Sequence, residues 1–156
     1  MKTFFRILCF VLLSSYFFLS CTTIDLYESS VSIPGHEWKS SYKPDFHFTI
    51  TDTTKPYKLF LVLRHTDKYD FNNLYLNFYI KGPGSDSILK RQQDVTLATN
   101  DSGWLGNGMD DIYEHRILLE KHTLKAGEYS FTIEQIMRED PLKNVLNVGL
   151  RLEKDK

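Results

Sequence analysis

Apolar and polar residues alternate with a period of two through most of this chain, and that alternation restricts the chain to β-structure. In "DFHFTIT", Phe46, Phe48 and Ile50 alternate with polar residues, and "NLYLNFYIK" and "GEYSFTIEQ" repeat the pattern. Successive side chains of a strand point to opposite faces of the sheet, so a strand with one buried face alternates in this way. We predict strands at residues 45–52, 57–65, 73–81, 87–99, 112–120, 127–135 and 144–153.

Seven strands, or eight if 87–99 contains two, indicate an all-β domain over residues 37–156. The segment "YKLFLVLRH" is apolar almost throughout, which is typical of a central strand covered on both faces. No stretch has the pattern of an amphipathic helix longer than two turns, and the nearest, "EQIMRED", is stopped by Pro141. We therefore predict an antiparallel β-sandwich with either a jelly-roll or an immunoglobulin-like topology.

The first twenty residues have the layout of an export signal. Lys2 and Arg6 precede an apolar run that is shorter than the roughly 20 apolar residues of a bilayer span. The run ends in "FLSC", which resembles a bacterial lipoprotein box, where the cysteine is lipidated and becomes the new N-terminus. An uncleaved anchor helix is the alternative interpretation. We predict a signal peptide over 1–20, lipidation of Cys21, and a Ser/Thr-rich tether over 21–36.

Removal of this signal changes the cysteine count and the net charge. Cys9 leaves with it, so Cys21 would be the only cysteine, and neither a disulfide nor a metal site of several cysteines could form. Two basic residues and no acidic ones are lost, which leaves 17 basic against 20 acidic residues. This slightly acidic chain lacks the basic stripe of a nucleic-acid-binding protein. We expect membrane attachment through acyl chains alone.

Candidate metal ligands are scattered or lie in turn-like sequence. The five histidines lack the close spacing of zinc ligands, and His47 and His115 alternate with core positions, so we predict that both lie on strand faces. The segment "NDSGWLGNGMDD" carries oxygen donors that could suit calcium, but it lacks the register of an EF-hand loop. Asn, Asp and Gly are also the usual turn residues. We predict no metal and no cofactor.

The sequence also gives no sign of a catalytic site. No serine lies in a G-x-S-x-G elbow, and the cysteine that remains after export is the one predicted to carry lipid. The paired carboxylates of a glycoside hydrolase would meet only in space and would leave no local pattern. We predict that the protein is not an enzyme and has no catalytic residues.

Three of the predicted loops are longer than the others and rich in aromatic and polar residues. If each connection reverses direction, the second, fourth and sixth loops share one end of the sandwich. These loops are "HTDKYDFNN", "NDSGWLGNGMDD" and "IMREDPLK", and they carry Tyr69, Asn72, Asn73, Trp104, Asp110, Arg138 and Asp140. Loops hold functional residues more often than strands do. We predict that this end docks a protein partner.

In that surface Trp104 would be the anchor and Arg138 a polar contact. The simpler alternatives are that Trp104 plugs one end of the core beneath its loop, and that Arg138 is held in a structural ion pair. The prediction also depends on residues 87–99. If they form two strands, the loop with Trp104 moves to the opposite end.

Several segments together resemble a known protein family. They are "LVLRHTDKYDFNNLYL", "GWLGNG", "GEYSFTIEQIMREDPLKNVLNVGLRLEK" and the lipoprotein box, in this order over nearly the whole chain. In these segments the chain resembles the GldH family of gliding-motility lipoproteins of the Bacteroidota. The resemblance implies a small cell-envelope lipoprotein needed for gliding, whose machinery is shared with type IX secretion, and it supplies no catalytic residues.

The same resemblance leads to expectations about location and partners. We expect a lipid anchor in the outer membrane, and the periplasmic face, because "CTTIDLYESS" has no compact acidic cluster like those that resemble surface-export tags in this phylum. Protein partners of the motility and secretion apparatus are the first hypothesis. A carbohydrate- or peptidoglycan-binding module is the second, and a row of exposed aromatic residues on one sheet face would favour it.

Overall fold

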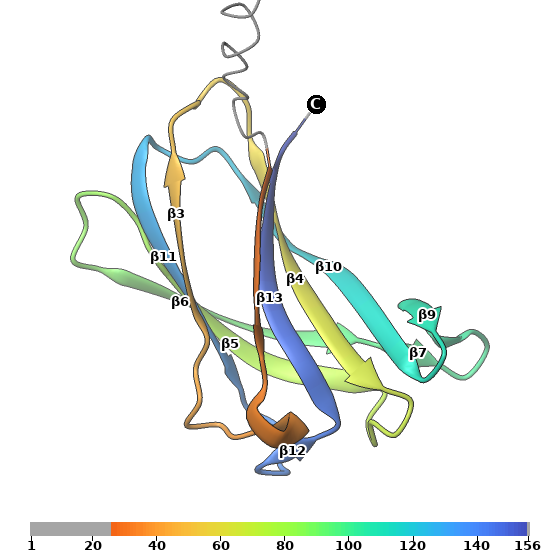
Figure 1. The fold of residues 1–156 in the computed structure, drawn as a ribbon. Helices are drawn as coiled ribbons and strands as arrows, with labels where there is room; N and C mark the ends of the chain where they lie inside the picture. Colours follow the sequence, from red (N-terminus) through yellow and green to blue (C-terminus); the bar gives the residue numbers. More distant parts are fainter. Residues whose placement is uncertain (1–25, 156) are drawn as a thin grey trace, which may run out of the picture.

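Two antiparallel sheets packed face to face make up the described part of the protein, residues 26–155 of a computed structural model (Figure 1). The predicted signal peptide and Cys21 lie outside the described residues. The first sheet has the order β1-β13-β4-β10-β9, with bounds Leu26–Ser32, Val145–Lys154, Tyr57–Thr66, Ile112–His122 and Asn107–Met109. The second has the order β3-β11-β5-β6, with bounds Asp45–Ile50, Gly127–Gln135, Asn73–Lys81 and Ile88–Thr96. The predicted sandwich is confirmed.

The order of the eight long strands identifies the jelly-roll alternative. The chain crosses from β1 to β3, β4 and β5, and then from β6 to β10, β11 and β13, changing sheet at each of these steps. Among the long strands, β5 and β6 are the one consecutive pair that lies within a single sheet. Eight strands arranged in two such interleaved sheets form a jelly roll.

Residues 87–99 run in one direction as two consecutive strands that are separated only by Leu97. β6 ends at Thr96, and after Leu97 the chain continues into β7 (Ala98–Thr99), which pairs with β8 (Gly103–Trp104). Leu97 is fully buried, and its backbone N–H donates to the Asn72 carbonyl rather than to a sheet neighbour. Since the direction of the chain does not reverse within this segment, the alternation of loops between the two ends of the sandwich is preserved.

The predicted tether differs from the structure, which has a seven-residue strand within it, at Leu26–Ser32. β1 pairs antiparallel with β13 along its whole length, from Leu26 opposite Glu153 to Ser32 opposite Asn147. Its side chains alternate, and Tyr27 packs on Phe48 of the second sheet with ring centroids 5.6 Å apart. The serines in "LYESSVS" conceal this alternation in the sequence, because they supply no apolar inward face to recognise. The sandwich therefore begins at β1 and not at residue 37.

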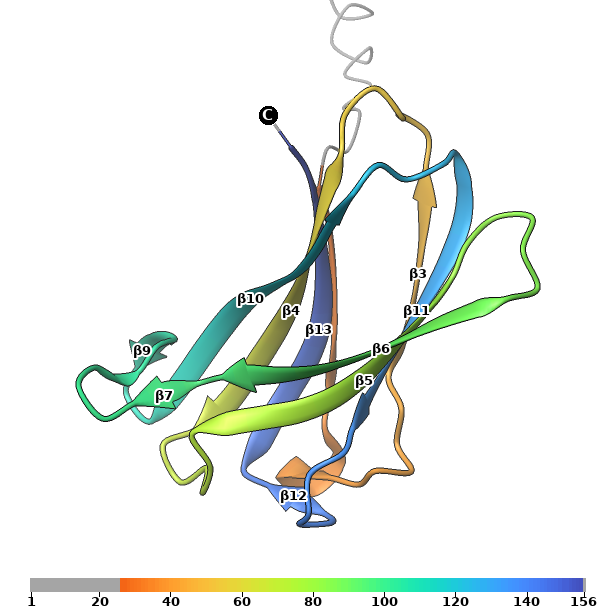
Figure 2. The same cartoon turned by 180° about the vertical axis from the view of Figure 1, so that it is seen from behind.

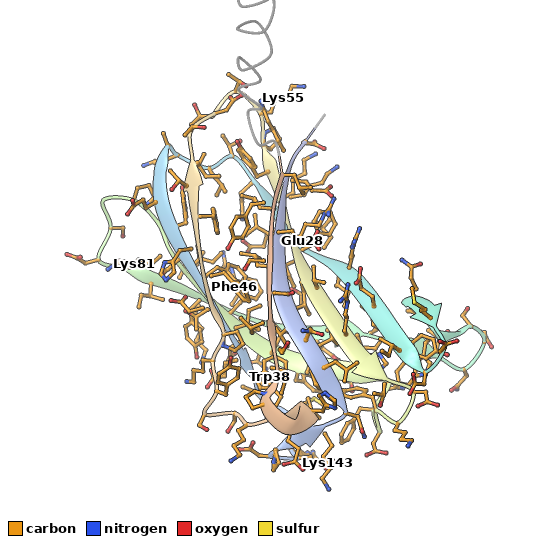
Figure 3. The ribbon with its side chains drawn as sticks, viewed as in Figure 1. Glu28, Trp38, Phe46, Lys55, Lys81 and Lys143 are labelled. Carbon is orange, nitrogen blue, oxygen red and sulfur yellow. The ribbon has the colours of Figure 1, made fainter. Side chains whose placement is uncertain are left out.

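The hydrophobic core lies between the sheets and is closed below by a short two-stranded ribbon. β2 (Glu37–Trp38) follows the 3-10 turn η2 (Pro34–His36) and pairs with β12 (Leu142–Lys143). Trp38 is completely buried, and its indole N–H donates to the Tyr42 carbonyl at 2.9 Å (Figure 3). Within residues 26–155, no helix is long and apolar enough to span a membrane.

The sandwich has two distinct ends. The upper end, marked by Lys55 in Figure 3, consists of the connections 51–56, 82–87 and 123–126 together with the start of β1. The lower end, marked by Lys143, consists of the connections 33–44, 67–72, 100–111 and 136–144 (Figure 2). The chain thus enters the described fold at the upper end.

Candidate functional site

The three long loops lie together at the lower end and are joined to one another by hydrogen bonds. The Asp67 N–H donates to the Asp111 carbonyl at 2.7 Å, which joins the first loop to the second. The Asn144 side-chain amide donates to the Lys68 carbonyl at 2.7 Å, which joins the first loop to the third. Loop 67–72 therefore bridges the other two, so the lower end is one connected surface.

Asn72, Arg138 and Asp140 are the predicted contact residues that the structure leaves exposed, and of these Asn72 and Arg138 have side chains that bond to no residue in 26–155. The Asn72 carbonyl accepts from the N–H groups of Leu97 and Ala98 at 2.7 and 3.0 Å, so its backbone is fixed while its side chain faces solvent. Arg138 forms no ion pair with any residue in 26–155, contrary to the structural alternative considered for it. Both side chains are available to a partner. Asp110 is also exposed, with its backbone at a positive φ of 54°.

Tyr69 supports this surface from beneath and is not part of it. It is 4% exposed, and its hydroxyl donates to the Asn73 carbonyl at 3.0 Å. Burial raises the pKa of that hydroxyl, and the nearby Glu139 carboxylate raises it further. The loop folds back over the end of the sandwich, so a residue from its middle enters the core.

Trp104 is half-buried, between the two alternatives considered for it. Its ring packs on His65 with centroids 4.4 Å apart and on Tyr113 at 5.7 Å, and it lies 6.3 Å from Tyr69. Most of the indole thus closes the core, while part of it remains accessible on the lower end. A contact made through this residue would use that exposed part only.

Asn73 and Asp140 are occupied by bonds within the protein. The Asn73 amide donates to the Asp94 carboxylate at 2.8 Å, across the β5–β6 pair. The Asp140 carboxylate accepts from the backbone N–H of Ser40 at 2.9 Å and from the Ser40 hydroxyl. These bonds lower the pKa of Asp140 and fasten the 136–144 loop to the turn after β2.

Beneath Trp104 lies a buried histidine pair that sequence reasoning missed. His65 and His115 are 0% and 3% exposed, and their Nε2 atoms are 2.9 Å apart. His65 Nδ1 lies 2.7 Å from the Thr66 carbonyl, which requires the His65 proton on Nδ1 and leaves His115 to donate between the rings. Burial lowers the pKa of both rings, that of His115 to about 4. The two residues are far apart in sequence, so only the β4–β10 register brings them together.

Metal ligands do not gather at this end or elsewhere in the described chain. Within residues 26–155, no three His, Cys, Asp or Glu side chains are placed to hold a metal ion.

A second polar cluster lies on the outer face of the second sheet. Glu134 accepts from the Tyr79 hydroxyl at 2.5 Å and from the Asn77 amide at 3.1 Å, and it pairs with Lys43 at 2.7 Å. The Lys43 ammonium is the main cause that lowers the pKa of Glu134, to about 2. Asn77 is only 5% exposed, and its Oδ1 has no hydrogen-bond partner among the described residues. Tyr75, two residues earlier on the same face, is 42% exposed.

This cluster has the chemistry of a ligand site, with an aromatic ring, a buried amide oxygen that lacks a donor and a fixed carboxylate. The alternation of "NLYLNFYIK" places Tyr75, Asn77 and Tyr79 on one face of β5. Glu134 joins them through the pairing of β5 with β11, where Asn77 lies opposite Glu134.

Comparisons with known proteins agree on one family. The model of the GldH lipoprotein family matches residues 25–152. A gliding motility lipoprotein GldH homolog of Christiangramia forsetii is 28% identical over 163 residues, covering 99% of this chain and 98% of the relative. The gliding motility lipoprotein GldH of Flavobacterium johnsoniae is 29% identical over 150 residues, covering 92% of this chain and 93% of the relative.

Two solved structures resemble the chain weakly. A carbohydrate-binding module specific for non-crystalline cellulose, CBM28, has a TM-score of 0.48 at 10% identity, over 83% of this chain and 73% of the module. The VP2 subviral particle of infectious bursal disease virus has a TM-score of 0.37 at 12% identity, over 81% of this chain and 32% of that protein.

Proposed function

The chain belongs to the GldH lipoprotein family, a family of membrane-anchored gliding-motility lipoproteins, and from this premise we propose that its lower end docks a protein of the gliding and type IX secretion apparatus. In this proposal the protein is a non-enzymatic accessory component. Cys21 carries the lipid, and the anchor lies in the outer membrane with the domain on the periplasmic side.

The observation that carries the proposal is the joining of three loops into one surface at the end opposite the start of β1. Cys21 precedes Leu26 by five residues, which span at most about 18 Å when extended, so the lipid would sit near the upper end. β13 has 10 residues and is roughly 33 Å long at 3.3 Å per residue. In this proposal the lower end is therefore separated from the lipid-bearing upper end by about that distance and faces away from the bilayer. A surface held there is presented to proteins and not to the anchoring membrane.

The test uses the two exposed contact residues. The double substitution Asn72→Ala and Arg138→Ala removes side chains that make no bond within the described chain, so we expect normal amounts of folded protein and reduced colony spreading. A matched double substitution at the upper end, Lys55→Ala and Asp86→Ala, also removes two exposed side chains and is expected to leave spreading unchanged. Normal spreading and secretion with the lower-end variant would contradict the proposal.

Glycan binding is a second candidate function, supported by the cluster on the outer face of the second sheet. An exposed tyrosine ring can stack on a sugar, and the unpartnered Asn77 Oδ1 can accept from a sugar hydroxyl. Retention of the protein on purified peptidoglycan or on soluble polysaccharides tests this candidate. Tyr75→Ala should reduce retention, and Leu118→Ala, which is exposed on the first sheet, should not. Equal retention of both variants, or none by the unaltered protein, would exclude this face as a glycan site.

A further inference from the structure

Strands β6 and β10 diverge toward the upper end (Figure 2). A cleft that opens to solvent lies there, lined by residues of both sheets. Its volume is about 390 Å³, within the roughly 300–1,000 Å³ of small-molecule sites. The lower halves of the same strands are closed over the core, where Val95 and Leu97 are buried. The upper half of β6 therefore turns its inner face toward open space.

The floor and mouth of this cleft are apolar. Phe48, Leu59, Ile80, Leu124 and Tyr129 line the inside. At the mouth Leu89 lies directly opposite Ile80 in the β5–β6 register and so faces inward, yet it is 43% exposed. Its neighbour Ile88 also lines the cleft and is 61% exposed. Apolar side chains left accessible in this way are stabilised by any apolar ligand that covers them.

An ion pair joins the two sheets beside the cleft, where Glu120 and His122 belong to the lining and Arg91 reaches Glu120 from outside it. Arg91 of β6 donates through Nε to Glu120 of β10 at 3.3 Å, and His122 lies 3.2 Å from the other oxygen of Glu120. The two terminal nitrogens of Arg91 bond to no residue in 26–155, and the side chain is 51% exposed. A guanidinium with free donors is suited to an anionic group such as a carboxylate or a phosphate.

We propose that this cleft binds the acyl chain of a single-chain anionic membrane lipid, with the chain between the sheets and the anionic head on Arg91. Both halves of such a lipid are matched, since the apolar lining takes the chain and the free guanidinium donors take the head. The position supports the same occupant, because the cleft lies at the upper end, where β1 begins five residues after the proposed lipid anchor. That the lipid comes from the membrane rests on the proposed anchorage at Cys21. The ability of the cleft to bind a lipid does not depend on that anchorage.

Binding can be measured on residues 22–156, which contain every described strand and core residue. The probe is a naturally fluorescent fatty acid, displaced by palmitate. Leu89→Glu places a charge at the mouth and is expected to raise the Kd for the fatty acid at least about tenfold, which corresponds to 1.4 kcal/mol. Leu118→Glu introduces the same change at a leucine that is 48% exposed on the outer face of the first sheet, and it is expected to leave the Kd unchanged. Thermal melting of both variants checks that they are folded.

A second comparison tests the head group. Arg91→Gln should weaken binding of palmitate but not of its uncharged methyl ester, since only the acid uses the guanidinium. Equal Kd values for the Leu89 and Leu118 variants, or no displacement of the probe by palmitate, would overturn the proposal. So would binding of the methyl ester that equals that of the acid in the unaltered protein, because Arg91 would then contact no head group. A failure of these tests leaves docking at the lower end untouched.

Discussion

His65 Nε2 and His115 Nε2 lie 2.9 Å apart in a part of the lower end from which water is excluded. The hydrogen bond between the rings needs one Nε2 atom with a proton and one without, and burial opposes a charge on either ring. The Trp104 ring packs on His65, so a change in the protonation of the histidine pair would disturb the packing of the loop that carries Trp104.

The free energy of unfolding should therefore fall as the pH falls from the ordinary histidine pKa of 6.5 to the pKa of about 4 of folded His115. The unfolded chain takes up protons near the ordinary histidine pKa of 6.5, whereas folded His115 does so only near a pKa of about 4. Unfolding binds protons in this window, so the free energy of unfolding declines from pH 6.5 to 4 by about 3 kcal/mol for His115 alone. Urea unfolding at several pH values measures it.

The double substitution His65→Phe and His115→Leu is the control for that window. It should flatten the decline between pH 6.5 and 4 and leave a second decline at lower pH, where Glu134 and Asp155 are protonated. Each of these carboxyls has its pKa lowered to about 2, so it contributes stability above its unfolded pKa that is lost as the pH falls toward 2. An unchanged decline above pH 4 in the double variant would contradict the assignment.

Gly106→Ala should loosen the loop that carries Trp104. A Cβ at this position would lie 2.7 Å from the Glu114 carbonyl and 2.9 Å from the His115 ring, and neither neighbour is free to move. We expect a loss of about 1–3 kcal/mol in the free energy of unfolding and a shift in tryptophan fluorescence. Asn107→Ala, an exposed neighbour, should change neither quantity.

Asp140→Ala and Arg138→Ala should differ although both residues are exposed in the same loop. The first removes the acceptor of two bonds from Ser40 and is expected to lower the melting temperature. The second removes a side chain without a partner among residues 26–155 and should leave the melting temperature unchanged. A lower melting temperature for Arg138→Ala would show that it has a structural role, and its effect on motility would then say nothing of docking.

Lipidation of Cys21 can be tested by intact-mass spectrometry of protein extracted from membranes. We expect a chain that begins at Cys21 and carries acyl groups, because "FLSC" resembles a lipoprotein box. Cys21→Ala should keep the signal uncleaved by the lipoprotein route. An unmodified Cys21 in the unaltered protein would contradict the prediction, and ready digestion of intact cells by protease would contradict the periplasmic face.

The long strands could be predicted because their apolar faces are continuous in the sequence. Phe131 and Ile133 alternate with polar residues, and both are completely buried in β11. The meeting of the three long loops was predicted on the condition that residues 87–99 do not reverse direction, and the structure meets that condition, since the chain continues past Leu97 without a turn. β1 could not be recognised because its inner face is Tyr27, Ser29 and Val31, and its stability comes from β13, more than a hundred residues later.

The contents of the candidate sites were less predictable than their positions. His115 was expected on a strand face and lies on one, but its partner His65 is set by the register of two strands that are distant in sequence. Tyr69 was a predicted partner contact, with burial at the end of the core as the alternative, and it is buried because its loop folds back over the core. Glu134 and Asn77 likewise become one cluster only through pairing between β5 and β11. Local pattern predicts which face a residue takes, while non-local pairing decides what it meets there.

The pairing of β1 with β13 also determines how the protein would bear a mechanical load. A pull between the lipid and a partner on the lower end acts along the axis of β1. The force is therefore perpendicular to the hydrogen bonds between β1 and β13. All the hydrogen bonds of the seven-residue ladder then resist together in shear, instead of opening one after another as in a zipper. A flexible tether would first have to be extended before it transmitted any tension. A strand fixed along its length passes force from Leu26 to the rest of the domain without slack.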